Sequence, residues 1–544
     1  MSPGAERYRA ALRRRGLETD EEIGGLLRSA AALWPNREAV VFGTTRLTFA
    51  GLHRWSERVA ADLVQAGVSP GDRILWQVPN SLEGLVLHLA GWRIGAVCVP
   101  VVPLYREHEM AHIIGDSQPA AVAFSTRSGG TRSGGRRPVD EMQVLLDRLG
   151  VRPLVRYAVG EAVPGWSSLP QAPGTDDPPP AGLPEPGPAH EPCLVLYTSG
   201  TTSAPKGVMH SSRSLIAEAR TIQQVYGLSP ADTFLMGAPI THIAGLLCAL
   251  VLPAAIGART ALLPGWDPDM AVRVAHEERA TFCQGATVFL RDLVDRYEKA
   301  GPELHRLSLF MCGGSAIPPS LIERADAAGV KAWRAWGMTE APTTAFSTPD
   351  DPLERRAHTE GRPSPGTEIQ AVDPGRGPLP PGETGELRVR SPEQMLGYTD
   401  PALTAEQVDD EGWFYSGDVG YVDSGGWLVM TGRLKDIINR GGEKFSAQDI
   451  EQVVGSHPAI ASVAVVGRPD ERLGECVVAF VVLADGARWP GAAELTRHLE
   501  QAKLARQKFP VAWYVVDRLP MTLSGKVQKH KLAAPEYASC ERRD

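Results

Sequence analysis

Residues 196–208 of this chain read Leu196-Tyr-Thr-Ser-Gly-Thr-Thr-Ser-Ala-Pro-Lys-Gly-Val208. An apolar run that predicts a buried strand leads into this stretch, and a helix is expected to start near Ser211. Hydroxyls, small residues and one lysine in a turn offer backbone N–H groups and a cation, the chemistry that holds a polyphosphate. A Walker A loop is excluded, because Lys206 lies between Pro205 and Gly207 and does not lead into a helix beside a hydroxyl residue. The stretch therefore predicts one strand–loop–helix unit of an α/β fold with a phosphate-binding loop.

Strands and helices alternate on both sides of this loop. Upstream, Thr48 caps an expected helix, and strands are predicted at 73–78, 96–102 and 120–124. Alternation resumes at Cys193, and further strands are predicted at 233–240, 281–288 and 307–312. Such a pattern implies crossover connections and mostly parallel sheets covered on both faces. We expect two doubly wound sheets, the second beginning at Cys193.

The last third of the chain has a different pattern. From about residue 361, short alternating strands with turn residues predict a small β subdomain, with a strand at 385–390 and a hairpin around 424–426. Beyond it, helices are expected at 447–454 and 492–504, and strands at 460–466, 476–482 and 511–516. About 110 residues suffice for an independent α+β domain. We therefore expect a large N-terminal domain (1–434, with a β subdomain at about 361–434) and a C-terminal domain (435–544).

Composition excludes several classes of protein. A length of 544 residues allows several domains, and 43% hydrophobic with 22% charged residues is ordinary globular usage. A net charge of -8 argues against nucleic acid as the main partner. Seven cysteines without a C-x-x-C pair predict reduced thiols, and no apolar h-region follows the N-terminal arginines, so a cytoplasmic location is expected. Those arginines are expected on a solvated helix face, with a partner-binding arm as the alternative.

No membrane span is predicted. The longest apolar run, at 243–256, is shorter than the ~20 residues that a spanning helix needs, and it contains Pro253.

Five motifs in a fixed order carry a family resemblance. They are Thr198 to Gly207, Trp336-Gly-Met-Thr-Glu340, Tyr415-Ser-Gly-Asp418, Gly432-Arg-Leu-Lys-Asp436 with Arg440-Gly-Gly-Glu-Lys444, and Leu519-Pro-Met-Thr-Leu-Ser-Gly-Lys526. With this set the chain resembles the adenylate-forming superfamily of acyl-CoA synthetases, free-standing adenylation domains and beetle-type luciferases. The resemblance implies a large N-terminal domain joined by a hinge to a small mobile domain, and the use of ATP, Mg2+ and coenzyme A.

The resemblance also assigns the nucleotide site. It makes Trp336 a ring that stacks on adenine, Asp418 the acceptor of the ribose hydroxyls, and Glu340 a Mg2+ ligand; Asp418 is expected in a turn between apolar strands. A lone Glu is enough, because magnesium often takes one or two protein carboxylates besides substrate phosphates. The implied nucleotide-binding residues are Thr198, Ser199, Gly200, Thr201, Thr202, Trp336, Gly337, Asp418 and Arg433, and the implied catalytic residues are Lys206, Thr339, Glu340 and Lys526.

The C-terminal motifs imply a two-step reaction. Lys526 lies in a Pro/Ser/Gly-flanked loop, and a mobile cation suits a step whose charge develops transiently. By the resemblance, Lys435 and Asp436 form the hinge. Rotation then removes Lys526 and presents Arg440, Gly441 and Gly442 to the thiol of coenzyme A, since glycines leave room for a pantetheine arm.

The acyl pocket is expected around two further stretches. They supply His242 and Gly245, and then Gly313, Gly314, Ser315 and Ala316. His242 is the candidate wall of the pocket; the alternative is a core histidine satisfied by hydrogen bonds. Thr241-His242 stands where amino-acid-activating relatives place an aspartate, which argues against a zwitterionic substrate. The small residues indicate room for a wide group, and fatty, aromatic and bulky alicyclic acids all stay open.

Two departures from the family pattern leave alternatives open. Ser203 replaces the usual glycine of the phosphate loop, which questions the efficiency of ATP use. Trp336 replaces the commoner tyrosine, which keeps stacking and removes a phenol hydrogen bond. The sequence predicts an AMP-forming acid–thiol ligase. The alternatives are a free-standing enzyme that loads an acyl-carrier protein, an enzyme of the thiolation half-reaction only, a non-catalytic scaffold and a luciferase-like oxygenase.

Overall fold

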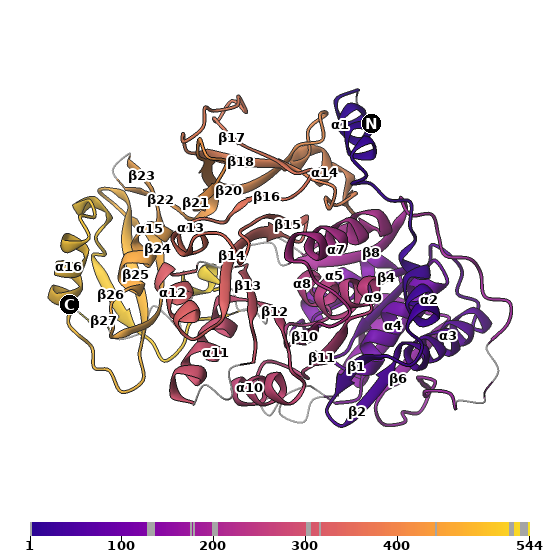
Figure 1. Cartoon of the computed structure of the whole chain (residues 1–544). Helices are drawn as coiled ribbons and strands as arrows, with labels where there is room; N and C mark the ends of the chain where they lie inside the picture. Colours follow the sequence, from indigo (N-terminus) through magenta and orange to yellow (C-terminus); the bar gives the residue numbers. More distant parts are fainter. Residues whose placement is uncertain are drawn as a thin grey trace.

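Two large sheets, one of nine and one of eight strands, form most of the computed structural model (Figure 1). A four-stranded sheet and a six-stranded C-terminal sheet complete it. The predicted α/β fold class is thereby confirmed. The structure describes residues 3–127, 137–174, 177, 180–198, 205–300, 306–314, 317–440, 443–521, 527–533 and 542–543.

The eight-stranded sheet is parallel at its centre and covered on both faces. Ile74 and Trp76 of β3 (Arg73–Gln77) point into a core shared with helices α3 (Phe49–Gln65) and α4 (Leu82–Arg93). Leu75 points into a core shared with helices α5 (Glu107–Ser117) and α6 (Pro138–Leu149). This alternation is the two-residue period of a strand buried on both sides. The strand order is β19 (Gly397–Tyr398), β9 (Lys206–Ser211), β8 (Pro192–Thr198), β4 (Val97–Pro100), β3 (Arg73–Gln77), β5 (Ala121–Ser125), β6 (Val155–Val159), β7 (Ser167–Ser168).

The nine-stranded sheet draws its strands from both ends of the large domain. Its order is β16 (Arg362–Pro363), β15 (Ala341–Phe346), β14 (Lys331–Met338), β13 (Leu309–Gly313), β12 (Phe282–Gly285), β10 (Thr233–Met236), β11 (Arg259–Leu262), β1 (Glu38–Phe42), β2 (Thr45–Thr48). The strand at Cys193 was expected to begin this second sheet, which is wrong. It is β8, which pairs with β4 of the eight-stranded sheet, while β1 crosses to pair with β11. Local pattern identifies a strand, but its sheet depends on tertiary pairing.

One predicted strand of the nine-stranded sheet is too long. A strand was expected at 281–288, yet β12 ends at Gly285 and helix α11 begins at Thr287. The β-branched Thr287 and Val288 favour a strand locally, but α11 buries a helical stripe that includes Leu290, Leu293 and Val294. Burial of that stripe outweighs strand propensity. The strand expected at 233–240 similarly ends at Met236.

The β subdomain is an antiparallel sheet of β17 (Glu368–Val372), β18 (Gly385–Arg390), β20 (Phe414–Val422) and β21 (Leu428–Arg433). The predicted strand at 385–390 and the hairpin around 424–426, which joins β20 to β21, are both present. Helix α1 (Pro3–Arg14) lies near this subdomain (Figure 1), where the Tyr8 hydroxyl donates to the Gly366 carbonyl at 2.9 Å. The N-terminal arginines up to Arg14 therefore lie on a helix, as expected.

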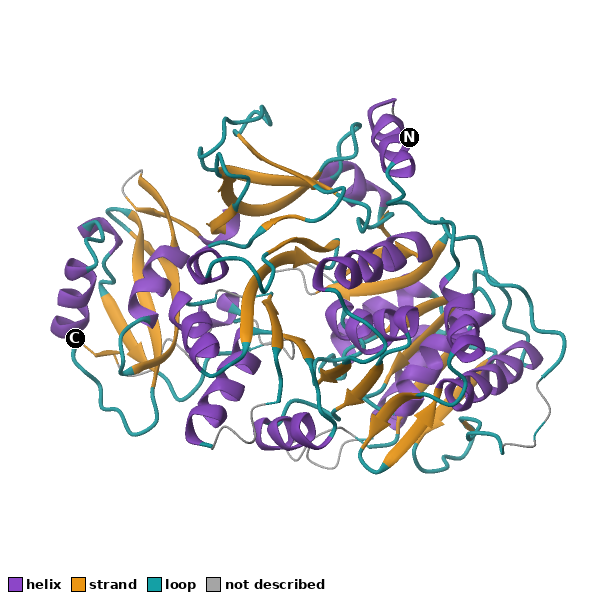
Figure 2. Cartoon of the chain, in the orientation of Figure 1, coloured by secondary structure: helices purple, strands orange, loops and turns teal. Residues whose placement is uncertain are grey.

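The C-terminal sheet lies beside the end of the nine-stranded sheet (Figure 1) and carries helices against its strands (Figure 2). Ile450 of α15 (Ala447–Gly455) and Leu495 of α16 (Ala492–Gln501) are buried in one core with Val477 and Trp513. Its strands are β22 (Ile437–Arg440), β23 (Glu443–Ser446), β24 (Ile460–Asp470), β25 (Gly474–Leu483), β26 (Ala512–Val515) and β27 (Arg542–Arg543).

The helices cover the sheets and connect their strands. Thr48 caps α3 as expected, since its hydroxyl accepts from Gly51 N. No helix in the described part of the chain is both long and apolar enough to cross a membrane. The remaining helices are α2 (Ile23–Leu33), α3 (Phe49–Gln65), α4 (Leu82–Arg93), α5 (Glu107–Ser117), α6 (Pro138–Leu149), α7 (Ser212–Tyr226), α8 (Ile243–Leu246), η1 (Leu247–Val251), α9 (Leu252–Ile256), α10 (Pro268–Glu277), α11 (Thr287–Lys299), α12 (Pro319–Ala327), α13 (Leu353–His358), α14 (Pro401–Gln407), η3 (Leu434–Asp436), α15 (Ala447–Gly455), α16 (Ala492–Gln501), η4 (Arg506–Lys508) and η5 (Lys529–Ala533).

Candidate active site

Three side chains from separate motifs meet at what we call the nucleoside end of the site. The Trp336 indole N–H donates to Asp418 Oδ2 at 2.8 Å, and Arg433 Nε lies 2.8 Å from Asp418 Oδ1. Asp418 and Trp336 are only 3% and 5% exposed, whereas the Arg433 side chain is 41% exposed. Since a carboxylate offers about four lone-pair sites, Asp418 can still accept ribose hydroxyls.

Asp418 lies inside strand β20 and not in a turn, which corrects the expectation. It pairs with Arg433 of β21 across the antiparallel ladder, an arrangement that brings opposite charges into contact. Gly417 before it has φ of 69°, in the left-handed region, and the pairing shifts register between Val419 and Gly420. Turn-forming residues here mark an irregularity within a strand, which the sequence alone does not distinguish from a turn.

Trp336 supplies a hydrogen bond that the sequence did not suggest. Replacing the family's tyrosine was expected to remove a phenol hydrogen bond. The indole N–H instead donates directly to the buried Asp418 carboxylate. The substitution therefore exchanges one donor for another at this position.

Thr339 and Glu340 form what we call the phosphate end, in the two-residue turn between β14 and β15. Glu340 Oε1 accepts from the Tyr398 hydroxyl at 2.8 Å, and the Glu340 carbonyl accepts from Met395 N at 2.8 Å. The Thr339 carbonyl lies 2.7 Å from Nε2 of His210, at the end of β9. Burial lowers the pKa of His210 to about 4, so the ring is neutral and donates one N–H at neutral pH.

Lys206 reaches the same place from the phosphate loop. It is the first residue of β9 and pairs with Thr198, the last residue of β8, so the loop closes a β-hairpin. The helix expected to start near Ser211 is α7, which begins after the Ser211 cap, and the unpredicted strand β9 lies between the loop and this helix. The Lys206 ammonium lies 5.7 Å from the centroid of the Tyr398 ring. Ser199, Gly200, Thr201, Thr202 and Ser203 lie outside the described residues.

Tyr398 and His210 are contacts that sequence reasoning missed. Tyr398 is 4% exposed and sits in the short edge strand β19, which carries no distinctive local pattern. Burial and the neighbouring Glu340 carboxylate raise the pKa of Tyr398, so the phenol stays protonated. His210 follows Lys206 by four residues, but an isolated histidine in a strand gives no signal of its role.

Two of the glycines predicted to line the acyl pocket lie close to backbone carbonyl groups. A Cβ on Gly245 would lie 2.0 Å from the Pro239 carbonyl oxygen, and one on Gly313 would lie 3.2 Å from the Ala335 carbonyl oxygen. Close backbone approach therefore explains Gly245, whose small size is no measure of room for a wide acyl group, whereas a side chain at Gly313 would make a tight contact. His242 caps α8, with Nδ1 accepting from Ala244 N at 3.4 Å, and Gly314 follows β13. Ser315 and Ala316 lie outside the described residues.

The expected hinge residues, Lys435 and Asp436, lie in η3 between β21 and β22. Burial, and then the charge of Arg433, lowers the pKa of Lys435. Oδ2 of Asp436 lies 3.8 Å from Nζ of Lys529 in the C-terminal tail. Arg440 ends β22, and its guanidinium donates to the Gln507 carbonyl at 2.5 Å. Gly441, Gly442 and Lys526 lie outside the described residues.

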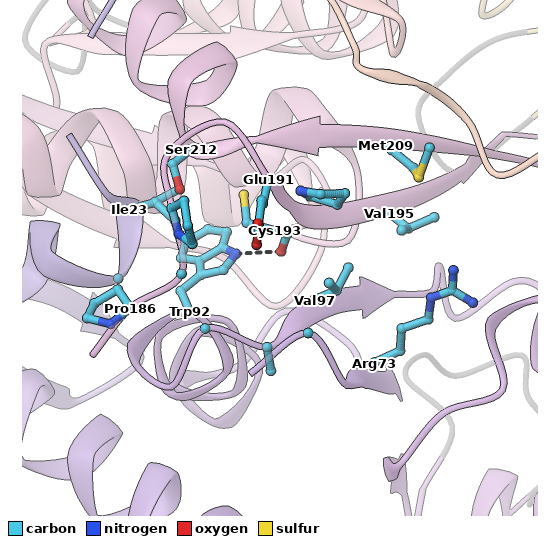
Figure 3. A pocket seen from close by; sticks show the side chains of 17 residues that line it. Ile23, Arg73, Trp92, Val97, Pro186, Glu191, Cys193, Val195, Met209 and Ser212 are labelled. Carbon is cyan, nitrogen blue, oxygen red and sulfur yellow. Dashed lines mark hydrogen bonds between the residues drawn. The ribbon is translucent and has the colours of Figure 1, made fainter. Parts of the chain in front are cut away.

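A cavity of about 200 Å³ lies elsewhere in the eight-stranded sheet (Figure 3). Its walls include Arg73, Val97 and Met209, and Trp92 of α4 donates to the Cys193 carbonyl at 3.0 Å there. These residues differ from those of the predicted site, so this cavity is separate from the cluster around Asp418 and Glu340.

Comparison with known proteins identifies the family to which this chain belongs. The model of the AMP-binding enzyme family matches residues 27–399, and that of the AMP-binding enzyme C-terminal domain matches residues 449–526. The chain belongs to the AMP-binding enzyme family. A medium-chain fatty-acid–CoA ligase of Escherichia coli (strain K12) is 36% identical over 97% of this chain and 92% of the relative. A feruloyl-CoA synthase of Amycolatopsis sp is 32% identical over 92% of this chain and 96% of the relative.

A solved structure agrees with the fold of this AMP-binding enzyme. ATP-bound MatB from Rhodopseudomonas palustris superposes with a TM-score of 0.81 at 28% identity, covering 94% of this chain and 98% of that one. This AMP-binding enzyme is an ATP-dependent, AMP-forming acid–thiol ligase, whose substrates are a carboxylic acid and coenzyme A.

Proposed function

We propose that this enzyme makes an acyl-CoA in two half-reactions at the site around Asp418 and Glu340. In the first, a carboxylate attacks the α-phosphate of ATP, releasing pyrophosphate and forming an acyl-adenylate. In the second, the thiol of coenzyme A displaces AMP from the adenylate. The observation that carries the proposal is the contact of Asp418 with both Trp336 and Arg433, since Trp336 lies in the same short stretch of chain as Thr339 and Glu340.

Each described side chain has a proposed role in the first half-reaction. Trp336 offers a ring face for adenine, and Asp418 accepts the ribose hydroxyls with charge-assisted strength. Arg433 contacts the nucleotide beside them. Lys206 and Thr339 stabilise charge on the phosphates as it develops. Of the phosphate loop, Thr198 is described, and Ser199, Gly200, Thr201 and Thr202 complete the proposed set.

The residues at the phosphate end fit Mg2+. Glu340 is half-buried and offers hard carboxylate oxygen; Oε1 is held by Tyr398, and no other described residue bonds Oε2. The described residues contain no group of three or more His, Cys, Asp or Glu that could hold a metal by itself, so Glu340 would share the ion with the ATP phosphates. Bound Mg2+ supplies positive charge that neutralises the phosphate oxygens.

We propose that the C-terminal domain, 435–544, alternates between two positions about Lys435 and Asp436. In one, Lys526 stabilises the charge of adenylate formation. In the other, Arg440, Gly441 and Gly442 border the path of the coenzyme A thiol. The position of Lys435 and Asp436 in a short segment between two sheets supports the hinge, because such segments absorb dihedral changes.

The acyl substrate is proposed to be an apolar monocarboxylic acid, either a medium-chain fatty acid or an aromatic acid. His242 and the apolar Ile243 and Ala244 after it support an apolar wall. The two relatives named above act, by their names, on a medium-chain fatty acid and on ferulate. Coenzyme A is the acceptor of both relatives, and neither supports the alternative of an acyl-carrier protein. A pyrophosphate-release screen over fatty, aromatic and alicyclic acids, each with coenzyme A, identifies the acid.

A cytoplasmic location is proposed on the state of the cysteines. The six cysteines in the described part of the chain are free thiols, as a reducing compartment predicts.

The two half-reactions give a direct test. Lys526→Ala is expected to slow adenylate formation by about a hundredfold or more, the scale for removing one transition-state donor. It should still convert supplied acyl-adenylate to acyl-CoA at the wild-type rate. Lys531→Ala, an exposed lysine of the same tail, is the matched control and should leave both steps unchanged. Equal loss of both steps in the Lys526 variant would refute the alternation.

A further inference from the structure

Tyr398 contacts both charged groups of the phosphate end. Its hydroxyl donates to Glu340 Oε1 at 2.8 Å, and its ring faces the Lys206 ammonium at 5.7 Å. The contacts use different parts of one rigid side chain: a phenol donor for the anion and an aromatic face for the cation. Neither Lys206 nor Glu340 has an ion-pair partner among the described residues, so this tyrosine is their shared contact.

The backbone fixes Tyr398 in this place. β19 pairs antiparallel with β9, so that Tyr398 lies opposite Val208, two residues from Lys206. Tyr398 N donates to the Thr404 hydroxyl, and Thr399 N donates to the Gly207 carbonyl, both at 2.8 Å. A Cβ on Gly207 would lie 2.7 Å from the Thr399 hydroxyl oxygen, so a larger residue there would have to displace the Thr399 side chain. The ring is therefore held independently of any bound nucleotide.

Opposite charges left alone in a partly buried site attract one another. Without a group between them, the Lys206 ammonium and the Glu340 carboxylate would gain energy by pairing directly, and that pair would have to break before phosphates bind. We propose that Tyr398 is a positioning residue that keeps the Glu340 carboxylate and the Lys206 ammonium apart and oriented to receive the phosphates of Mg-ATP. This inference rests on the proposed function, since it concerns the same site.

The proposal distinguishes between nucleotides. AMP fills the nucleoside end and lacks the β- and γ-phosphates and their metal, so its binding depends little on Tyr398. Binding of Mg-ATP engages Glu340 and Lys206 and depends on both being in place. A merely structural role of Tyr398 would weaken both ligands together.

Titration calorimetry of Tyr398→Phe with AMP and with Mg-ATP provides the test. The Kd of Mg-ATP is expected to rise roughly tenfold, the loss of one hydrogen bond to a charged group, and the Kd of AMP to change less than twofold. The matched control is Tyr157→Phe, which removes a buried hydroxyl that donates to Asp62 in another part of the fold and should change neither Kd. An equal loss for both nucleotides, or an unchanged Kd of Mg-ATP, overturns the proposal.

A double-mutant cycle covers the case in which the Phe variant is poorly folded. In a Glu340→Gln background, Tyr398→Phe should weaken Mg-ATP binding by less than a further twofold, because its effect acts through the carboxylate. A further tenfold loss there contradicts the proposal. An absence of ATP–pyrophosphate exchange by the wild-type enzyme would instead refute the proposed function. The binding results would still test the role of Tyr398, because calorimetry does not depend on that reaction.

Discussion

The two ends of the site differ in how their charges are balanced. At the nucleoside end, both oxygens of the buried Asp418 already have a partner in the protein: Oδ2 accepts a hydrogen bond from Trp336, and Oδ1 forms an ion pair with Arg433. At the phosphate end, Tyr398 is the one side chain of the described residues that contacts both Glu340 and Lys206. Both ends have a carboxylate and a cation, and in the part of the chain that the structure describes the two form an ion pair at the nucleoside end but not at the phosphate end.

The two ends therefore differ in how far they are organised before a ligand binds. A buried carboxylate needs hydrogen bonds and a counter-charge, because an uncompensated buried charge is strongly destabilising. Asp418 has both, so the nucleoside end is preorganised by the protein itself. The more exposed Glu340 and Lys206 tolerate separation, and their charges are completed by phosphates and metal. The nucleoside end should therefore bind AMP and ATP alike, and the phosphate end should respond to Mg-ATP alone.

The largest expected effect comes from breaking the nucleoside end. Asp418→Ala removes the acceptor of the ribose hydroxyls and leaves Arg433 without its partner. We expect the Kd values of AMP and Mg-ATP to rise together by about a hundredfold, since more than one charged hydrogen bond is lost. Equilibrium binding of the two nucleotides measures this. A variant that lost Mg-ATP binding and kept AMP binding would contradict the division into two ends.

A smaller change sharpens the same comparison. Trp336→Phe keeps an aromatic face for adenine and removes the indole N–H that donates to Asp418. We expect AMP and Mg-ATP to lose affinity equally, by roughly tenfold, whereas Tyr398→Phe affects Mg-ATP alone. Both variants are compared by calorimetry at matched Mg2+. Selective loss of Mg-ATP in the Trp336 variant would show that the two ends are not separable.

The last prediction concerns the pH dependence of stability behind the phosphate end. The backbone N–H of Met395 donates to the Glu340 carbonyl, and Glu393 lies two residues before Met395. Glu393 is fully buried, and burial raises its pKa to about 7. Glu218, also fully buried, has its pKa raised by burial and by Glu393. A raised pKa means that the folded state binds the proton more tightly than the unfolded state does. The stabilising contribution of protonated Glu393 is therefore full below pH 4.5 and falls as the pH rises to about 7.

Glu393→Gln mimics the protonated acid and should remove the part of this pH dependence that Glu393 contributes. We expect the variant to be more stable than wild type at pH 8, by on the order of 3 kcal/mol, and nearly equal to it at pH 4.5. Thermal unfolding at the two pH values measures the difference. Equal destabilisation at both would mean that the carboxylate is held in its charged form.

Much of the fold was predictable from local pattern. The strand at Gly385–Arg390, the helix cap at Thr48 and the start of the helix at Ala447 lie where alternation, capping and turn residues placed them. Errors arose where tertiary contacts outweighed local preference. The residues after Gly285 joined a helix, and Asp418 joined a strand despite the turn-forming residues before it. Gly245, where small size was taken to indicate room for substrate, is also required by its close approach to the Pro239 carbonyl.

By itself, the sequence determined the class of fold, the order of the motifs and the family to which they point. These depend on two- and 3.6-residue periods and on short runs of residues, all of which are local. Only the tertiary structure decided that the strand at Cys193 pairs with β4, that Trp336 donates to an aspartate 82 residues away, and that Tyr398 meets Glu340 across 58 residues. Such contacts are set by how sheets and helices pack, and no local preference of the chain specifies them.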